Sequence, residues 1–145
     1  MNTTLFDKTE YGYDMKKDTS KKSLVIQIEK IITYSDIENI VITALEDGIG
    51  YWACLNNTTT EWNEKPENMP ISQWATELLL TGKSITFDDA EWDNFKDEKL
   101  NLEKLLKGIA LNIQERPDDC DLDNMDATTA DCIIQFALFG EVIYG

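Results

Sequence analysis

The side chains best suited to chemistry in this sequence are carboxylates, and one short run spaces them like the start of a calcium-binding loop. Asp119, Asp121 and Asp123 occupy relative positions 1, 3 and 5. The rest of the run departs from a calcium loop, because position 6 is Asn124 rather than glycine and position 12 is Ala130 rather than glutamate. We therefore interpret the run as a solvated acidic turn and expect no metal site.

The sequence lacks the general base that usually activates a serine or cysteine nucleophile. The chain of 145 residues contains no histidine, which excludes Ser-His-Asp and Cys-His pairs and histidine-ligated metals. Cys54, Cys120 and Cys132 are an odd number without a Cys-x-x-Cys pair, a pattern typical of reduced thiols in the cytoplasm. No phosphate-binding loop occurs. Close carboxylate pairs arise by chance among 28 Asp and Glu residues, so they indicate no acid–base catalyst. We expect a non-enzymatic protein without a cofactor.

The charge of the chain restricts its partners. Asp and Glu outnumber Lys and Arg by 28 to 13, which gives a net charge of −15. Hydrophobic residues make up 42% and aromatic residues 10%, enough for a packed core rather than a disordered acidic tail. So negative a protein is a poor ligand for nucleic-acid phosphate or an anionic membrane. No apolar run is long enough to span a bilayer, and the polar N-terminus does not resemble a signal peptide. We expect a cytoplasmic protein that binds neither nucleic acid nor membrane directly.

The hydrophobic pattern predicts an α+β fold, a mostly helical compact single domain with about four helices and a small sheet of short strands. Residues 1–20 show no periodicity and read as a flexible arm, whereas 21–145 form the acidic domain. Residues 24–28 and 31–34 favour strands. Ser35 and Glu38 match a capping box, and the helix behind it carries an apolar stripe. That stripe comprises Ile37, Ile40, Val41, Ala44, Leu45, Tyr51, Trp52 and Leu55.

Three more helices are expected further along the chain. Pro70 suits the first turn of a helix that runs to about residue 81 and stops at Gly82. Asn101 can cap a helix that ends at Pro117, and Asp126 can cap the last helix, which Gly140 ends. Short strands are expected at 84–87 and 142–144, with 88–99 as an acidic connection. The inward stripe of the third helix comprises Leu102, Leu105, Leu106, Ile109, Ala110 and Ile113.

The most distinctive segment is this acidic connection, because large aromatic residues interrupt its carboxylates. Carboxylates on a rigid face can imitate the phosphates of a nucleic acid, and aromatic side chains can anchor the contact. The alternative is a solvated face whose aromatic residues pack into the core. The residues expected to bind a partner are Asp88, Asp89, Glu91, Trp92, Asp93, Phe95, Asp97 and Glu98.

A second candidate site lies near the end of the first predicted helix. Gly48 and Gly50 would bend the chain there, and Tyr51 and Trp52 could stack on a small ligand such as a nucleotide signal. A nucleotide is anionic and needs nearby cations, which here are only Arg116 and scattered lysines.

The sequence resembles a widespread set of small uncharacterised proteins encoded by phages and prophages of Gram-positive bacteria. The segments that carry the resemblance are 42–52, 105–109 and 130–141, and it covers most of residues 23–145. No assigned catalytic residue comes with it. It implies an accessory phage gene, and small acidic proteins of that kind often inhibit host defences, including CRISPR-Cas effectors. We therefore expect an inhibitor that blocks the nucleic-acid site of a basic host protein. The alternatives are a small-ligand binder and a structural or accessory phage protein, and the oligomeric state is left open.

Overall fold

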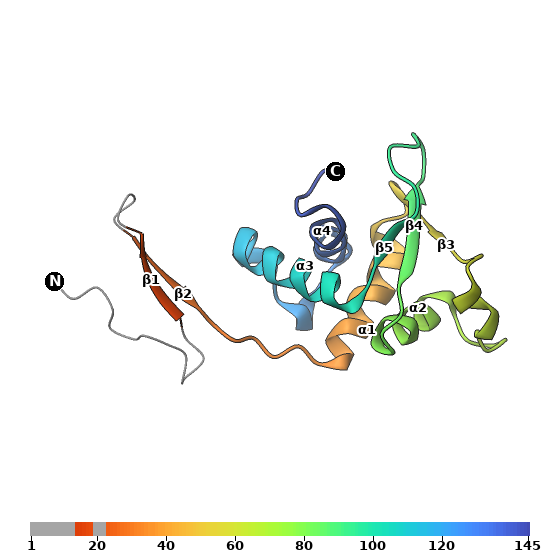
Figure 1. The fold of residues 1–145 in the computed structure, drawn as a ribbon, viewed down its shortest axis with the longest axis horizontal. Helices are drawn as coiled ribbons and strands as arrows, with labels where there is room; N and C mark the ends of the chain where they lie inside the picture. Colours follow the sequence, from red (N-terminus) through yellow and green to blue (C-terminus); the bar gives the residue numbers. More distant parts are fainter. Residues whose placement is uncertain (1–13, 19–22) are drawn as a thin grey trace. The chain divides into compact units, whose positions relative to one another are not determined.

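The computed structural model describes residues 14–18 and 23–145, and the chain divides into two units between Ile32 and Thr33 (Figure 1). In the first unit, strand β1 (Asp14–Asp18) pairs antiparallel with β2 (Ser23–Gln27). The strand expected at 24–28 is therefore present. The expected arm is partly a strand, and the boundary between the units lies at Ile32 rather than at residue 20. The rest of that arm, 1–13 and 19–20, lies outside the described residues.

The second unit begins with helix α1 (Tyr34–Thr43), whose start differs from the expected one. The capping box is formed by Thr33 and Asp36, not by Ser35 and Glu38. The Thr33 hydroxyl accepts a hydrogen bond from the Asp36 N–H at 3.1 Å, and the Asp36 carboxylate accepts one from the Thr33 N–H at 2.9 Å. The strand expected at 31–34 is consequently absent, because Tyr34 already belongs to the helix.

Helix α1 ends much earlier than the apolar stripe suggested. It passes into a π-helical turn, Ala44–Gly48, and the chain then forms strand β3 (Ala53–Asn56). Gly48 lies against the last helix, where an added Cβ would be 3.0 Å from the Ala127 carbonyl oxygen. The placement of Tyr51, Trp52 and Leu55 on the helical stripe is wrong, whereas the interruption expected at Gly48 and Gly50 is present.

Helix α2 (Ile71–Leu80) has the expected position. It follows Pro70, and Gly82 comes after it with a φ of 86°, a left-handed conformation that glycine adopts without strain. Its buried side includes Ala75, Leu78 and Leu79. The preceding segment, expected to be a loop throughout, contains a short 3-10 turn at Thr60–Glu64.

The sheet of the second unit has three antiparallel strands in the order β3–β4–β5, with β4 at Ile85–Asp89 and β5 at Glu98–Leu100. Leu55 faces Phe87, and Phe87 in turn faces Glu98. The acidic connection is thus largely the loop of a β-hairpin. Both of its ends belong to strands that bury Phe87 and Leu100 in the core.

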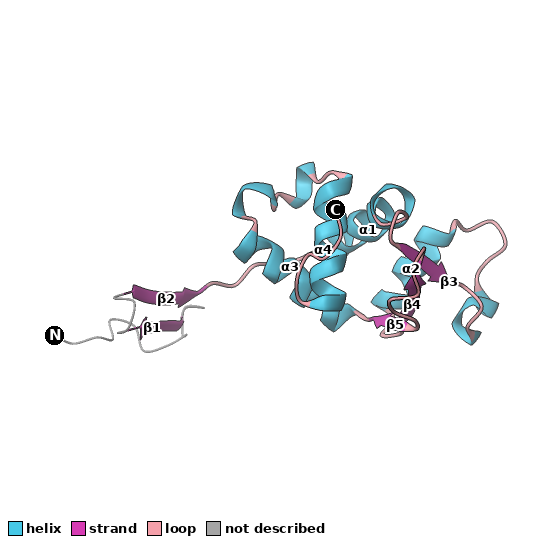
Figure 2. Cartoon of the chain, turned by 90° about the horizontal axis from the view of Figure 1, so that it is seen from above, coloured by secondary structure: helices cyan, strands magenta, loops and turns pink. Residues whose placement is uncertain are grey.

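Helices α3 (Leu102–Glu115) and α4 (Ala127–Phe139) begin at the expected caps. The Asn101 side chain accepts from the Lys104 N–H at 2.8 Å, and Asp126 accepts from the Thr129 N–H at 2.8 Å. Helix α4 is buried on all sides from residue 129 to 136, and Figure 2 shows it between α3 and α1. It is the central element of the unit.

Helices α3 and α4 approach each other most closely at Gly108. An added Cβ would lie 2.6 Å from the Ile133 carbonyl oxygen and 2.7 Å from the Ala137 Cβ. This close approach turns α3 so that Gly108 and Asn112 are buried, while Leu106 and Ala110 of the predicted stripe are exposed. The expected inward face of α3 is therefore rotated.

The predicted fold class is confirmed. Four helices and a small three-stranded antiparallel sheet form a mostly helical α+β domain. Residues 142–144 are not a strand but an irregular segment. In the described part of the chain, no helix combines the length and the apolar character needed to cross a membrane.

Candidate functional site

The Trp92 loop, residues 90–97, connects β4 to β5 and is held by two aspartates at the end of β4. Asp89 accepts backbone hydrogen bonds from Glu91 at 2.9 Å, Trp92 at 3.1 Å and Asn94 at 2.8 Å. Asp88 accepts one from the Asp97 N–H at 2.8 Å. The N–H groups of Glu91 and Trp92 hold the pKa of Asp89 below its usual range, so Asp89 is ionised at neutral pH. These two predicted partner-binding residues organise the loop.

The two aromatic residues of this segment have different surroundings. Trp92 is 75% exposed at the loop and is the most exposed tryptophan among the described residues. Phe95 is half-buried and packs edge-on against Trp52, with ring centroids 6.0 Å apart, and against Phe139 at 5.4 Å. Trp92 is therefore free to contact a partner, whereas Phe95 fixes the loop to the domain.

The other acidic residues of the segment surround Trp92 in sequence. Glu91, Asp93 and Asp97 are exposed, and Glu98 is half-buried in β5. Asp93 and Asp97 have positive φ values of 53° and 56°, which aspartate tolerates better than most residues. The loop thus presents carboxylates from a defined backbone.

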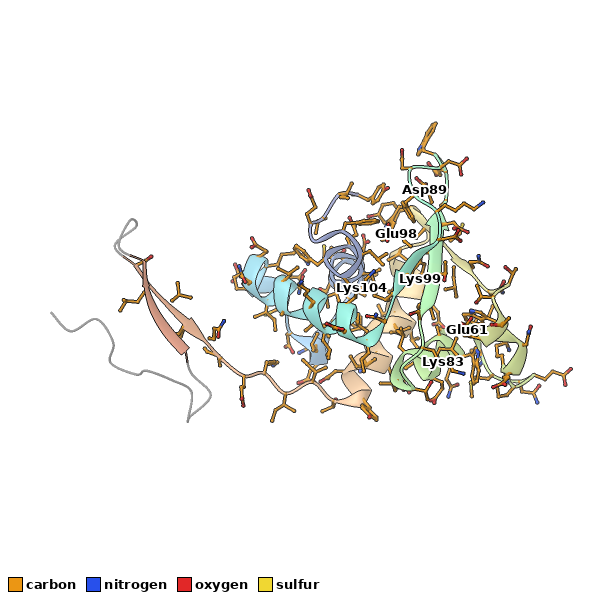
Figure 3. The ribbon with its side chains drawn as sticks, in the orientation of Figure 1. Glu61, Lys83, Asp89, Glu98, Lys99 and Lys104 are labelled. Atoms are coloured by element: carbon orange, nitrogen blue, oxygen red, sulfur yellow. The ribbon has the colours of Figure 1, made fainter. Side chains whose placement is uncertain are left out.

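Acidic and basic side chains are unevenly distributed along the sheet. Figure 3 shows Asp89 at the end of β4 that carries the loop and Lys83 near its other end, with Lys99 between them. Glu61 lies near this basic end. Hydrogen bonds from its own backbone N–H and from Thr59, with smaller contributions from Lys83 and Lys99, lower its pKa. Acids therefore predominate at the loop end of the sheet, whereas Lys83 lies at the opposite end together with Glu61.

The second predicted site is built around a residue that the sequence did not single out. Asp131 of α4 is only 7% exposed. Its Oδ2 accepts a hydrogen bond from the Tyr51 hydroxyl at 2.6 Å, and its Oδ1 accepts one from the Trp52 indole N–H at 2.8 Å. Burial and the neighbouring carboxylate raise the pKa of Tyr51, which keeps its phenol protonated.

Gln135, one helical turn after Asp131, connects the same carboxylate to the end of the chain. Its side-chain N–H group donates to Asp131 Oδ1 at 2.9 Å. Its Oε1 accepts from the backbone N–H groups of Ile143 and Tyr144, each at 2.7 Å. The Tyr144 ring stacks on Trp52, 5.0 Å between centroids and 5° from parallel. Residues 51–52, α4 and the segment after it are therefore held together.

This arrangement changes the interpretation of the second site. Trp52 is 2% exposed and already stacked, so it cannot offer a ring face to a nucleotide. Tyr51 is half-exposed and lines a pocket of about 410 Å³, the Tyr51 pocket, together with Gly48, Asp131 and Tyr144. Gly50 has no neighbouring atom within 4 Å of an added Cβ and does not line that pocket.

The two predicted sites are neighbours in the structure. A smaller pocket of about 260 Å³ is lined by Tyr51 and Trp52 from one prediction and by Asp89, Glu91 and Trp92 from the other. The backbone accounts for this proximity, since the Ala90 N–H donates to the Trp52 carbonyl at 3.0 Å. A partner that covers Trp92 would also reach Tyr51.

The acidic run at 119–126 serves the fold. Arg116 forms an ion pair with Asp119, whose other oxygen accepts from the Thr129 hydroxyl at 2.7 Å. No group of three or more potential ligands among residues 14–18 and 23–145 could hold a metal ion. Burial, the largest influence on Cys132, raises the pKa of its thiol, which makes it a poor nucleophile at neutral pH.

Asp131, Gln135 and Tyr144 are the site residues that sequence reasoning missed. One signal was present: Asp131 and Gln135 are spaced four residues apart in a segment that is otherwise apolar around the whole helix. A charged residue in such a helix must be buried and needs hydrogen-bond donors, which two aromatic residues with polar groups can supply.

We compared the chain with protein-family models, with curated proteins and with solved structures, and none of them matches it.

Proposed function

We propose that this chain is a non-enzymatic acidic binding protein that docks its Trp92 loop on a basic surface of a nucleic-acid-handling protein and blocks that surface. The observation that carries the proposal is the exposure of Trp92, 75%, on a loop whose backbone is fixed by Asp88 and Asp89. Tryptophan is among the residues that contribute most to protein interfaces. An ordered loop loses little entropy when it binds.

Charge favours a basic partner. Residues 36–145 contain seven Lys and Arg against 23 Asp and Glu, a net −16. Exposed carboxylates at Glu91 and Asp93 flank Trp92 and would approach the partner first. Opposite charge on the two surfaces accelerates association and excludes acidic competitors. The same carboxylates would repel a nucleic acid, so the chain would not bind nucleic acid itself. It would instead compete with nucleic acid for the basic surface of the partner.

The resemblance to phage and prophage proteins suggests the biological setting. We propose that the partner is a host defence protein, such as a CRISPR-Cas effector, and that binding takes place in the cytoplasm of the host cell. Sequestration of a nucleotide signal is less well supported, because Asp47 and Asp131 line the Tyr51 pocket and no lysine or arginine among residues 23–145 does. An anionic ligand would meet uncompensated negative charge there.

Affinity capture with paired baits tests the proposal. The wild-type protein and a Trp92→Ala variant are used to capture proteins from a bacterial lysate. Tyr34→Ala is the matched control, because Tyr34 is 71% exposed and lies in α1, outside the loop. We expect a basic nucleic-acid-binding protein on the wild-type and control baits but not on Trp92→Ala, and we expect duplex DNA or RNA to displace it. Capture that is indifferent to Trp92 and to nucleic acid contradicts the proposal.

Charge variants test whether the loop carboxylates, rather than the overall negative charge, accelerate association with the partner. Glu91→Lys with Asp93→Asn raises the charge by 3 and leaves Asp88 and Asp89 to hold the loop. Glu64→Lys with Glu67→Gln makes the same change at exposed positions elsewhere. Against the captured protein, we expect the loop variant to slow association about tenfold at low salt and the control to have a smaller effect. Equal effects of the two variants would show that the loop is not the docking surface.

A further inference from the structure

The Tyr51 pocket has a lining whose chemistry selects one class of ligand. Its volume of about 410 Å³ lies within the range of small-molecule sites. The lining includes two acidic residues, Asp47 and Asp131, two tyrosines, Tyr51 and Tyr144, and Thr128. No lysine or arginine of the described part of the chain lines it. The pocket is therefore negatively charged and partly aromatic.

No positively charged group of the described residues neutralises the charge of Asp131. Its three donors, Tyr51, Trp52 and Gln135, are uncharged groups. No lysine or arginine of the described residues forms an ion pair with Asp131. Arg116 is near enough to influence the pKa of the adjacent Cys132, but its ion pair is with Asp119. A buried carboxylate without a counter-ion is unusual, because an ionised group loses hydration when it is buried.

The Asp131 carboxylate also retains an acceptor position. An ionised carboxylate has about four lone-pair sites. Oδ1 uses both of its sites for Trp52 and Gln135, whereas among the described residues Oδ2 accepts only from the Tyr51 hydroxyl. The free acceptor site is therefore on Oδ2, the oxygen that also accepts from Tyr51. Tyr51 lines the pocket and is half-exposed.

We propose that the Tyr51 pocket binds an alkylammonium or guanidinium group. The cation donates to Asp131 Oδ2, Asp47 adds a second negative charge at an exposed position, and the rings of Tyr51 and Tyr144 contact the cation and its alkyl chain. The group can belong to a free small amine or to a lysine or arginine side chain of a protein. In the second case the pocket deepens the function proposed above, because it neighbours the Trp92 loop.

Binding of small probes tests the pocket without any partner protein. The full chain is titrated with n-butylguanidinium and n-butylammonium, and amide chemical shifts are followed by NMR. The neutral isostere n-butylurea is the control ligand. We expect both cations to shift the amides of Asp47, Gly48, Tyr51 and residues 127–131, and n-butylurea to bind at least about tenfold more weakly. Equal binding of n-butylurea, or no binding of either cation at about 10 mM, overturns the proposal.

Variants assign the binding to the two carboxylates. Asp131→Asn removes the buried charge and should abolish the cation-specific shifts. Because that change can also disturb the fold, Asp47→Asn serves as a second variant at an exposed position, with an expected loss of affinity of about fivefold. Asp118→Asn, an exposed acid that does not line the pocket, should leave affinity unchanged. If Asp47→Asn and Asp118→Asn behave alike, the cation is not bound in the pocket.

A capped arginine, N-acetyl-arginine-N-methylamide, distinguishes the two sources. Affinity equal to that of n-butylguanidinium assigns the pocket to a protein side chain, and much weaker affinity assigns it to a free small amine. Either result supports a cation site. If the probes fail while capture still depends on Trp92, only the pocket proposal is wrong; if the probes bind and capture fails, only the proposed function is wrong.

Discussion

The hydroxyl of Tyr51 donates a 2.6 Å hydrogen bond to Asp131, a residue 80 positions later in the chain. With the Trp52 indole, which donates to the same carboxylate, it fastens the turn before β3 to the central helix α4. The turn also contacts the backbone of the Trp92 loop, because the Trp52 carbonyl accepts a hydrogen bond from the Ala90 N–H. The strength of this attachment therefore affects both candidate sites.

Replacement of Tyr51 by phenylalanine should reveal the hydrogen bond through pH. The pKa of Tyr51 is raised in the folded protein, so the protonated phenol stabilises the fold fully below about pH 10, the ordinary pKa of tyrosine. As the pH rises above that value the unfolded state ionises first, and this stabilisation is lost. We expect Tyr51→Phe to reduce the free energy of unfolding by about 1–2 kcal/mol at pH 7, with a smaller difference above pH 10. Urea unfolding at several pH values measures it, and a constant difference contradicts the assignment.

Gln135 should control the order of the segment after α4. Gln135→Met keeps a similar volume but leaves the N–H groups of Ile143 and Tyr144 without their acceptor. We expect these two amides to exchange with deuterium at least about tenfold faster in the variant. Gln114→Met, at an exposed position of α3, is the control. Unchanged exchange would show that other contacts hold the segment.

Gly108 should tolerate no side chain. In Gly108→Ala the new Cβ would meet the Ile133 carbonyl oxygen at 2.6 Å, so α3 and α4 must separate. We expect a loss of about 1–3 kcal/mol of unfolding free energy, although alanine has the better helix propensity. Gly50→Ala makes the same chemical change where nothing lies within 4 Å, and it should leave stability nearly unchanged. Thermal unfolding of the pair measures the difference, and equal melting temperatures would refute the close contact.

Asp126 should stabilise α4 only while it is ionised. Hydrogen bonds from Thr129 lower its pKa, so its contribution is complete above about pH 4 and is lost as the pH falls through the lowered value. We expect Asp126→Ala to cost about 1 kcal/mol at pH 7 and less in acid. Asp118→Ala, at an exposed turn position, controls for the loss of one charge. Denaturant unfolding between pH 7 and pH 3 follows both variants, and a cost that does not shrink in acid would exclude the cap.

Elements with local signals could be predicted from the sequence. Pro70, Asn101, Asp126 and Gly140 lie at the helix ends where their chemistry places them. The end of α1 could be predicted only in part. Gly48 and Gly50 indicated an interruption, but Tyr51 extends the apolar stripe in sequence and is held by Asp131, far along the chain. A contact between distant residues overrode a helical period that continued past the two glycines.

The candidate site was predicted in part for the same reason. The sequence identified Trp92 and Phe95 together, but only the fold separates the exposed ring from the one packed on Trp52. Asp88 and Asp89 carry the same charge as Glu91, yet their carboxylates accept backbone hydrogen bonds of the loop. The role of each carboxylate, to support the loop or to face a partner, depends on the local backbone geometry. The amino-acid composition does not predict that geometry.

The uneven distribution of acidic and basic side chains along the sheet contributes to the electric dipole moment of the domain. Asp89 and the loop acids occupy one end, and Lys83 and Lys99 lie toward the other (Figure 3). In the field of a positively charged surface, such a molecule experiences a torque as well as an attraction. It would rotate before contact so that Trp92 leads, which reduces the number of unproductive collisions. Reversing Lys83 and Lys99 would therefore weaken this orientation although neither residue lies in the Trp92 loop.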